Sequence, residues 1–475
     1  MKNIPITLLL CCPPLLCQQP PAAQALSGIV RLNRLPVSNE TLKVKLPRPV
    51  ERPLSNGLKL LVVESHRVPN ITLNIRIPSG ELRSPADLPG LAGATAALIR
   101  QGTTGSNSQQ LAERLAELGA TLSFGAGEDS GFITVSAMTE NFDGALAVLT
   151  DVLLHPTFPR DEFEKWKTRT KAQLEQAKSQ PGFLASRETM KVLYPGDARS
   201  RNMTPESLDK MTRDDVVAHY RKYYVPTGQW AGIAGDITPR DAVAKLEKAL
   251  AAWKGAAVDA VTLPLPAQIA DKHVFLIARP NSVQTLLIVA NRAIGRNSPD
   301  YIGSQVMNRV LGAGPSSRLF RIIREEKGYT YGVGSFFTAT RVTNYFEAQT
   351  SVRTDVTEPA LTELMNQFRD IRDRAVPADE LADAKNAIVA GFVLGLESSS
   401  AVLNRWMEQR EYGLPEDYWD TYPDKVMAVT AADVQLVAKK YVPAGNPQII
   451  AVGDAQKIGD LLKKFGPVEE VPDSN

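Results

Sequence analysis

The sequence is poor in the residues from which most metal and catalytic sites are built. It has three cysteines and four histidines among 475 residues. All three cysteines (Cys11, Cys12 and Cys17) lie close to the N-terminus. If that segment is removed, the remaining chain has no thiol. It then gains neither a disulfide nor a cysteine metal site, and packing alone must stabilise the fold.

The chain also lacks an apolar run long enough to cross a membrane. Its N-terminal run, residues 4–16, is short and interrupted by prolines. The sequence A-Q-A at 23–25 fits a cleavage site, so we interpret residues 1–25 as a secretory signal peptide. The alternative is a lipoprotein modified at Cys17, although the bulky Leu16 precedes it where a small residue is preferred.

A strong charge of either sign is missing as well. The chain has 54 basic and 52 acidic residues, a formal net charge of +2. This balance indicates neither a nucleic acid nor an anionic membrane as partner, and we expect Arg318, Arg321 and Arg324 to be solvated on a helix face. With 43% hydrophobic and 22% charged residues, the composition is that of a soluble globular protein. The length allows about two to four domains.

The common catalytic motifs are absent from the sequence. There is no G-x-S-x-G, H-E-x-x-H, P-loop or dinucleotide fingerprint. None of the histidines has another ligand-type residue at a metal-binding spacing on one helix, so each is interpreted as a surface or packing residue; they are His66, His155, His219 and His273. By spacing alone, the chain has no complete catalytic site.

An internal repeat is the clearest organising feature. The dipeptide Val-Pro at 225 recurs at 442, an offset of 217 residues. Upstream, the heptapeptide FPRDEFE at 158 matches VPADELA at 376, an offset of 218. Two matches in the same order at nearly the same offset predict two homologous domains. The predicted parts are a signal peptide (1–25), a leader arm (26–44), a first domain (45–256), a linker (257–269) and a second domain (270–475).

The pattern of helices and hairpin strands in each half predicts an α+β protein. We expect each domain to be an α/β sandwich, with an antiparallel-rich sheet and helices on one face. In the first half, the turn signal Asn56-Gly57 precedes a strand at 58–63. The alternating run 68–77 is expected to pair with that strand.

The segment 312–332, GAGPSSRLFRIIREEKGYTYG, predicts a loop, a helix capped by Ser316 or Ser317, a stop at Gly328 and a strand. Arg324 falls in the last helical turn and Tyr331 in the following strand. A guanidinium and a phenol at this spacing could converge on one carbonyl oxygen. The alternative is a surface arginine and a half-buried tyrosine.

The whole chain after residue 25 resembles the M16 family of zinc peptidases, the pitrilysin and mitochondrial processing peptidase group, and is similar to its two-subunit bacterial branch. The resemblance rests on both halves: LSNGLKLLVVES, GLAGATAALIRQGTTG, YYVPTGQWAGIAGDI and PSSRLFRIIREEKGYTYGV. It implies that the two domains form half of a clamshell around a peptide-binding chamber.

The family's inverted zinc motif H-x-x-E-H is degenerate in this chain. The resemblance places its residues at Gly93, Ala96 and Ala97, and the third ligand, a glutamate, at Gln173. Glycine and alanine offer no donor atom to zinc, and the general base is missing too. We therefore expect no metal site in this chain, and we expect the small residues of the helix at 90–101 to let that helix pack tightly.

The other half of the family's active site is retained. Arg324 and Tyr331 match the pair that binds the substrate carbonyl and the oxyanion opposite the zinc. Tyr329 is two residues away and is expected on the same strand face as Tyr331, so only the spacing from Arg324 selects Tyr331.

These matches imply the non-zinc-binding subunit of a periplasmic heterodimeric metalloendopeptidase. A partner chain would bring zinc and the H-x-x-E-H motif, and this chain would hydrolyse peptides only with that partner. The alternative is a catalytically inactive peptide-binding or scaffold protein of the same fold, for which a homodimer is one arrangement. A self-sufficient peptidase is the third and least favoured hypothesis.

Overall fold

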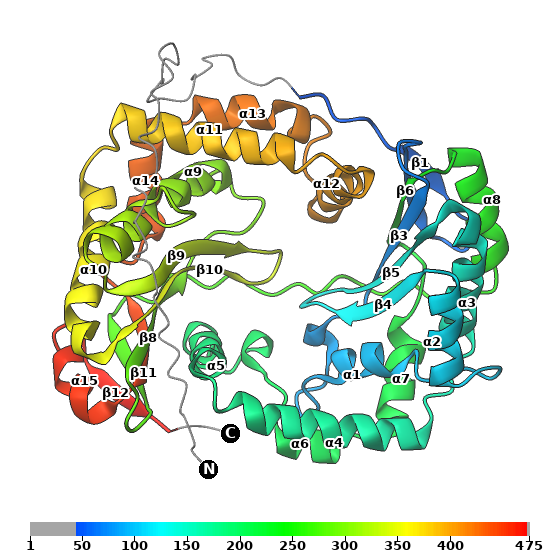
Figure 1. The fold of residues 1–475 in the computed structure, drawn as a ribbon, viewed down its shortest axis with the longest axis horizontal. Coiled ribbons are helices and arrows are strands. Elements are labelled where there is room, and N and C mark those ends of the chain that lie inside the picture. Colours follow the sequence, from blue (N-terminus) through cyan, green and yellow to red (C-terminus); the bar gives the residue numbers. More distant parts are fainter. Residues whose placement is uncertain (1–43, 473–475) are drawn as a thin grey trace, which may run out of the picture. The chain divides into compact units, whose positions relative to one another are not determined.

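The computed structural model describes residues 44–472. The signal peptide and all but the last residue of the leader arm lie outside the described residues. Each half of the described chain forms one six-stranded sheet (Figure 1). The first sheet contains β1 (Val50–Pro53), β2 (Lys59–Glu64), β3 (Asn70–Ile77), β4 (Thr121–Ala126), β5 (Gly131–Met138) and β6 (Trp230–Gly235). The second contains β7 (His273–Ala278), β8 (Gln284–Arg292), β9 (Thr330–Ala339), β10 (Asn344–Arg353), β11 (Gln448–Gly453) and β12 (Val468–Val471).

Helices flank both sheets and confirm the α+β class. The first half has α1 (Leu91–Leu98), α2 (Ser108–Glu117), α3 (Phe142–Leu154), α4 (Arg160–Ala177), α5 (Pro181–Leu193), α6 (Pro205–Lys210), α7 (Arg213–Tyr223) and α8 (Pro239–Leu250). The second half has α9 (Tyr301–Leu311), the π-helix η4 (Phe320–Glu326), α10 (Thr357–Asp373), α11 (Ala378–Leu394), α12 (Ser399–Tyr412), α13 (Tyr418–Ala428), α14 (Ala431–Tyr441) and α15 (Ala455–Leu462).

Five strands of each sheet follow the same order. The first sheet runs β2-β6-β3-β5-β4 and the second β7-β11-β8-β10-β9. In both, the first pair is parallel and the following pairs are antiparallel. The outer strand differs, because β1 is antiparallel to β2 whereas β12 is parallel to β7. This common order is consistent with the repeat in the sequence.

The predicted pairing of the run 68–77 with the strand at 58–63 is wrong. In the structure β6 lies between β2 and β3, so β3 pairs with β6 and β5. β6 comes from the end of the first half of the chain. β6 pairs with one edge of β2, and nothing in the local sequence of β2 or β3 indicates this insertion.

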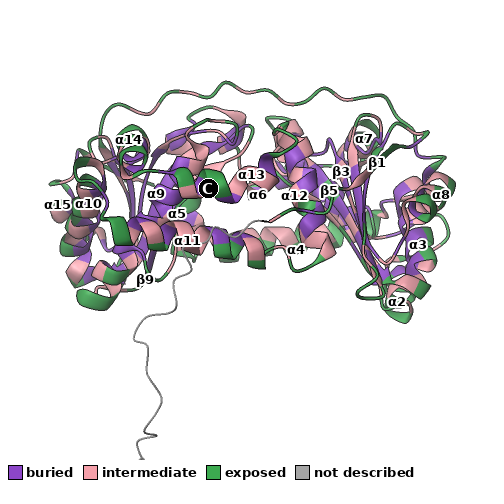
Figure 2. Ribbon diagram, turned by 90° about the horizontal axis from the view of Figure 1, so that it is seen from above, coloured by how far each residue is buried: buried purple, intermediate pink, exposed green. Residues whose placement is uncertain are grey.

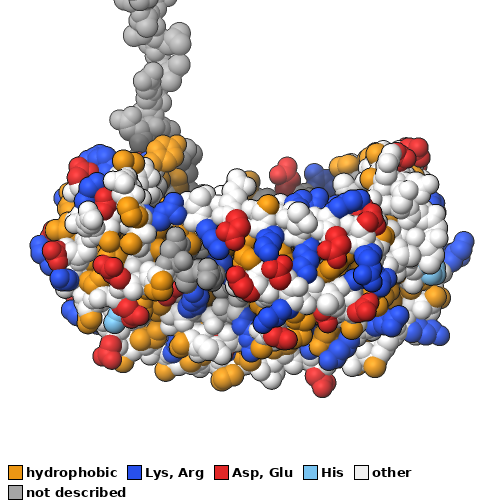
Figure 3. Space-filling view, turned by 90° about the horizontal axis from the view of Figure 1, so that it is seen from below, with side chains coloured by type: hydrophobic (Ala, Val, Ile, Leu, Met, Phe, Trp, Pro, Cys, Tyr) orange, Lys and Arg blue, Asp and Glu red, His pale blue; other side chains and the backbone are white. Residues whose placement is uncertain are grey.

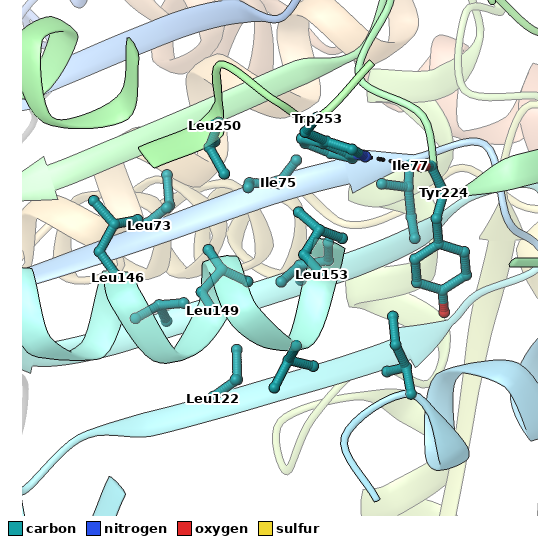
Figure 4. Close-up of a cluster of buried hydrophobic side chains, with 14 of the residues drawn as sticks. Leu73, Ile75, Ile77, Leu122, Leu146, Leu149, Leu153, Tyr224, Leu250 and Trp253 are labelled. Carbon is teal, nitrogen blue, oxygen red and sulfur yellow. Dashed lines mark hydrogen bonds between the residues drawn. The ribbon is translucent and has the colours of Figure 1, made fainter. Parts of the chain in front are cut away.

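The core of the first half forms between one face of its sheet and helices such as α3 (Figure 4). On β3 the buried residues alternate with half-buried ones, as expected for a strand with one fully covered face. Leu146, Leu149 and Leu153 of α3 repeat at helical spacing and face this sheet. Trp253 closes the cluster and donates its indole N–H to the carbonyl of Tyr224 at 2.8 Å.

The second face of each sheet is covered by a helix from the other half of the chain. α12 packs on β2 and β6, where Trp406, Leu403 and Met407 contact Leu61 and Val63. α5 packs on β8 and β11, with Leu184 and Leu193 against Ile288 and Ile450. The expectation of helices on one face therefore holds for each half's own helices. We call α5 and α12 the exchanged helices, because each covers the sheet of the other half. With them, each sheet lies between two layers of helices (Figure 2).

Surface charges alternate in sign on the face that carries α4 and α6, where Lys or Arg and Asp or Glu side chains are interspersed (Figure 3). Between residues 44 and 472, no single helix is long and apolar enough to cross a membrane. α11 and α12 meet that test only as a pair, and they are bent by 112° at the break between them.

Candidate functional site

The loop before η4 is closed by a serine, although not as predicted. The Ser317 hydroxyl donates to the carbonyl of Gly314 at 2.7 Å, so it tightens the turn and does not cap the helix. The helical ladder begins when the Arg321 N–H donates to the Ser317 carbonyl at 3.0 Å. The prediction that the side chain of Ser316 or Ser317 caps the helix is therefore wrong.

The helix that carries Arg324 is a π-helix rather than the α-helix we expected. Lys327 N–H donates to the carbonyl of Ile322, five residues earlier, at 3.0 Å. Such wide turns are rare and are frequently found at functional sites. Gly328 then ends the helix with φ of 64°, which confirms the predicted left-handed stop.

A β-bulge at the start of β9 controls the direction of Tyr331. Thr330 lies opposite Val352 and Val333 opposite Thr350, so Tyr331 and Gly332 together face one residue of β10. The Thr330 hydroxyl stabilises the bulge, because it donates to the Ser351 carbonyl at 2.7 Å and accepts from the Gly332 N–H at 3.1 Å. Bulges re-aim side chains next to active sites.

The bulge separates the two candidate tyrosines. Tyr331 is 90% exposed, whereas Tyr329 is half-buried and packs against the core of the second half. The expectation that both share one strand face is wrong, because Tyr329 precedes the strand and the bulge breaks the alternation. In the sequence, only the spacing from Arg324 distinguished Tyr331 from Tyr329. In the structure, their exposure to solvent distinguishes them as well. The isolated glycine at 332 was the available signal for a bulge.

The guanidinium of Arg324 stacks between two rings. Its central carbon is 4.5 Å from the centre of the Phe320 ring and 5.0 Å from that of Tyr331. In the part of the chain that the structure describes, no carboxylate lies within ion-pair distance of it. Phe320, which sequence reasoning missed, lies one helical turn before Arg324 and holds the guanidinium against Tyr331.

The other two arginines of this segment are already paired. Arg318 is only 6% exposed; it donates two hydrogen bonds to Glu380, at 2.8 and 2.6 Å, and one to Asp370 at 2.8 Å. Arg321 forms a surface pair with Glu326 at 2.5 Å. The prediction of three solvated arginines is therefore wrong for Arg318. Arg324 alone of the three keeps its hydrogen-bond donors free of a carboxylate.

Together, Arg324 and Tyr331 present donors without a charged acceptor. A guanidinium has five N–H donors and no acceptor, and a phenol has an O–H donor. Neighbouring donors of this kind can bind a carbonyl oxygen or stabilise the negative charge that develops on it.

The zinc-motif positions on α1 do not fit a metal. The backbone N–H of Gly93 donates to Glu81 Oε1 at 2.8 Å, and a side chain at 93 would begin only 2.8 Å from that oxygen. Ser84 donates to the other Glu81 oxygen at 3.1 Å and accepts from the Ala92 N–H at 3.1 Å. Glu81 and Ser84 thus satisfy the first turn of α1, and burial raises the pKa of the Glu81 carboxyl.

The remaining motif positions also lack ligands. Ala96 is buried, Ala97 is half-buried and Gln173 is exposed on α4. Within residues 44–472, no three His, Cys, Asp or Glu side chains are grouped so that they could hold a metal ion. These residues are compatible with a chain that binds no zinc.

The histidines have structural neighbours. His219 is 4% exposed, contacts Ser79 Oγ at 3.0 Å and packs on Tyr223, and burial lowers its pKa to about 4. His155 lies 3.3 Å from Asp151, one helical turn earlier. His155 follows the last residue of α3, so the two side chains do not lie on one helix, and between residues 44 and 472 no third ligand joins them.

Comparison with known families supports the resemblance in both halves. Residues 59–201 match the family described as Insulinase (Peptidase family M16). Residues 210–388 match the family described as Peptidase M16 inactive domain. The two matches together span well over half of the chain.

Relatives and solved structures agree with these matches. An uncharacterized zinc protease of Rickettsia felis is 22% identical over 352 residues, covering 72% of this chain and 83% of the relative. A protein of Helicobacter pylori, named non-peptidase homolog YmxG, is 23% identical and covers 85% and 94%. The crystal structure of a peptidase M16 inactive domain from Pseudomonas fluorescens is 26% identical, covers 86% and 98%, and has a TM-score of 0.79. This chain therefore belongs to the M16 peptidase family.

Proposed function

We propose that this chain is the non-zinc-binding subunit of a periplasmic heterodimeric M16 metalloendopeptidase. The observation that carries the proposal is the state of Arg324, whose guanidinium stacks on an exposed tyrosine and has no carboxylate partner among the described residues. An unpaired arginine and a phenol that is 90% exposed provide hydrogen-bond donors for a ligand.

The expected role of the pair is to bind a peptide carbonyl. Arg324 and Tyr331 donate hydrogen bonds to the carbonyl oxygen, and these bonds strengthen as negative charge develops on it. The hydrolytic centre, with zinc, its ligands and the general base, belongs to a partner chain that carries H-x-x-E-H. Gly93, Ala96, Ala97 and Gln173 supply no metal ligand here.

We also propose that residues 45–256 and 270–475 are copies of one ancestral domain, joined by the linker 257–269. The common strand order of the two sheets supports this. Export to the periplasm rests on the signal peptide interpreted at residues 1–25.

The competing function is a peptide-binding or scaffold protein without catalysis. One observation favours it, namely that the Helicobacter pylori relative is named a non-peptidase homolog. A scaffold that binds no peptide, however, gains nothing from donors kept free for a carbonyl.

The test is affinity purification of the tagged mature chain from its native host, followed by a peptide hydrolysis assay with and without a metal chelator. We expect a second chain of similar size that carries H-x-x-E-H, and hydrolysis that the chelator abolishes. A chain that purifies alone and does not cleave peptides would replace the heterodimer with the scaffold.

A further inference from the structure

His66 lies in the turn between β2 and β3, close to the point where β6 also ends. The turn comprises residues 65–69. Its main chain is attached to β6, because the Ser65 N–H donates to the Gly235 carbonyl at 2.8 Å. The ring of His66 makes two further connections, one to each of the strands that end beside it.

Both nitrogens of this ring contact a carboxylate. Nδ1 lies 2.5 Å from Asp236 Oδ1, and Nε2 lies 2.7 Å from Glu64 Oε1. Glu64 is the last residue of β2, and Asp236 follows the last residue of β6. The second oxygen of Asp236 accepts from the Thr139 hydroxyl at 3.0 Å, so this carboxylate is held from two sides. The ring of His66 thus joins the ends of two paired strands.

The two contacts together require a charged ring. A neutral imidazole has one N–H and one lone pair, an imidazolium has two N–H donors, and an ionised carboxylate only accepts. In the neutral ring, one lone pair would face a carboxylate oxygen at hydrogen-bond distance, which is repulsive. Both contacts therefore form only when His66 is protonated. In agreement, the hydrogen bonds to Asp236 and Glu64 raise the pKa of His66.

The surroundings of the ring contain few other charges. Among the described residues, Glu64 from β2 and Asp236 from the end of β6 are the charged groups within ion-pair distance of it. Arg67, the next residue of the turn, lines a cavity together with Glu397 of the loop between α11 and α12. The side chain of His66 is 57% exposed, so the pH of the solvent acts on it directly.

The equivalent turn of the second half lacks this arrangement. β2 and β7 end in the same register against β6 and β11, and both are followed by five-residue turns. Ala278 stands at the position of Glu64, and Pro280 stands at that of His66. Asp454, the aspartate that follows β11, pairs with a lysine of α15 at 3.0 Å. Lysine keeps its charge where histidine titrates, so this second turn has no comparable dependence on pH.

We propose that His66 is a pH-sensitive switch, which in its protonated form joins the β2–β3 turn to the ends of both β2 and β6. After deprotonation the ring has one N–H, so it keeps one carboxylate and releases the other. The turn shares its cavity with the loop that leads into the exchanged helix α12. The switch therefore acts where the two halves of the chain meet, and it does not depend on Arg324 or Tyr331.

The switch is closed on the acidic side of its titration. The pKa of His66 is raised above its ordinary value of 6.5 in the folded chain. The contribution of the two contacts to stability is therefore complete below the ordinary pKa, as long as both carboxylates are ionised. It is lost as the pH rises through the raised pKa.

The test is an NMR titration of the full mature chain, with labelled histidine rings, from pH 5 to pH 9. The signal that disappears in His66→Gln identifies this ring. We expect its pKa to exceed 6.5, and we expect Asp236→Asn and Glu64→Gln each to lower that pKa because each removes one carboxylate. Asp454→Asn is the matched control and should leave the titration unchanged. A pKa of 6.5 or less, or the same pKa in the wild type and both carboxylate variants, would overturn the proposal.

Hydrogen exchange measures the opening of the turn. After correction for the intrinsic effect of pH, the amides of residues 65–69 are expected to exchange severalfold faster at pH 9 than at pH 6. The turn at 279–283 is the internal control and should show no such change. His66→Gln should exchange at the faster rate at both pH values. Equal corrected rates for residues 65–69 of the wild type at the two pH values would overturn the release of the turn.

Discussion

At the scale of single residues, Gly93 is one of the four positions at which we expect the zinc motif of the family to be degenerate. Its N–H binds the Glu81 carboxylate, which lies where a longer side chain would begin. A carboxylate from outside the helix thus binds the first turn of α1 at this position. A histidine restored at 93 alone would meet this oxygen before it could meet a metal.

Tyr331→Phe tests the proposed role of the pair. In the assembled heterodimer we expect kcat to fall by about 10²–10³, the usual loss when one oxyanion donor is removed, with assembly unchanged. Steady-state peptide hydrolysis and size-exclusion chromatography measure the two effects. Tyr329→Phe is the matched control and should retain its rate. Unchanged turnover in Tyr331→Phe would remove Tyr331 from the site.

Glu347 gives a prediction about pH. It lies on β10, is 6% exposed, and desolvation raises the pKa of its carboxyl to about 7 from an ordinary value of 4.5. Between these pH values the unfolded chain has lost the proton that the folded chain keeps. The free energy of unfolding therefore falls as the pH rises through this window, by about 3 kcal/mol at most.

Glu347→Gln removes this dependence because the amide does not titrate. We expect urea unfolding at pH 5 and pH 8 to show a smaller loss of stability in the variant than in the wild type. The exposed Glu325→Gln is the control and should behave like the wild type. Identical pH profiles for Glu347→Gln and the wild type would show that Glu347 ionises in the folded protein as it does in the unfolded chain.

At the scale of elements, the π-helix η4 is attached to its surroundings by Arg318. This side chain joins η4 to α10 through Asp370 and to α11 through Glu380. The three hydrogen bonds of Arg318 fix the N-terminal end of η4. Gly328 and the bulge at Tyr331 fix the direction of the chain after its C-terminal end. The position of Arg324 depends on both.

Arg318→Met should therefore be far more destabilising than Arg321→Met. The first variant removes a buried guanidinium and its three charge-assisted hydrogen bonds to the half-buried Asp370 and Glu380, which costs roughly 1.5–3 kcal/mol. The second breaks only a surface pair whose side chains are about half exposed, worth less than about 1 kcal/mol. Thermal unfolding of both variants measures the difference. Equal melting temperatures would mean that Arg318 does not anchor η4.

At the scale of the whole molecule, the exchange of α5 and α12 links the two halves. The face of the first sheet formed by Leu61 and Val63 is covered by α12, and that of the second sheet by α5. Neither half can bury both faces of its sheet without the other. The chain between them, residues 257–269, is mostly exposed and contributes little of this burial.

We expect residues 45–256 and 270–475 to fail as separate proteins and to recover when co-expressed. Each half alone exposes a sheet face rich in Leu, Ile and Val, so it should aggregate or bind the dye ANS. The intact chain, cut at a protease site placed in the linker, should remain associated on size-exclusion chromatography. Two halves that are separately monomeric and cooperative in unfolding would contradict this view.

Much of the site could be predicted from the sequence because its signals are local. Gly328 has the left-handed conformation that ends the helix, and glycine is the residue expected there. Arg324 and Tyr331 are only seven residues apart, one before the end of the helix and one after the start of the strand. Period-two and period-3.6 patterns likewise identified the strands and helices, since each depends only on neighbouring residues. The α+β class and the family resemblance follow from such signals.

Contacts between distant segments were decided only by the tertiary structure. The residues near β2 do not indicate that β6 pairs beside it. The sequence of α12 likewise does not indicate that this helix covers the first sheet. The bulge at Tyr331 depends on the register of β10, and the burial of Arg318 depends on carboxylates from α10 and α11. The sequence alone determined which elements form and which chemical groups they carry. Packing between segments far apart in the chain decided which of those groups are paired and which, like Arg324, remain free to bind a ligand.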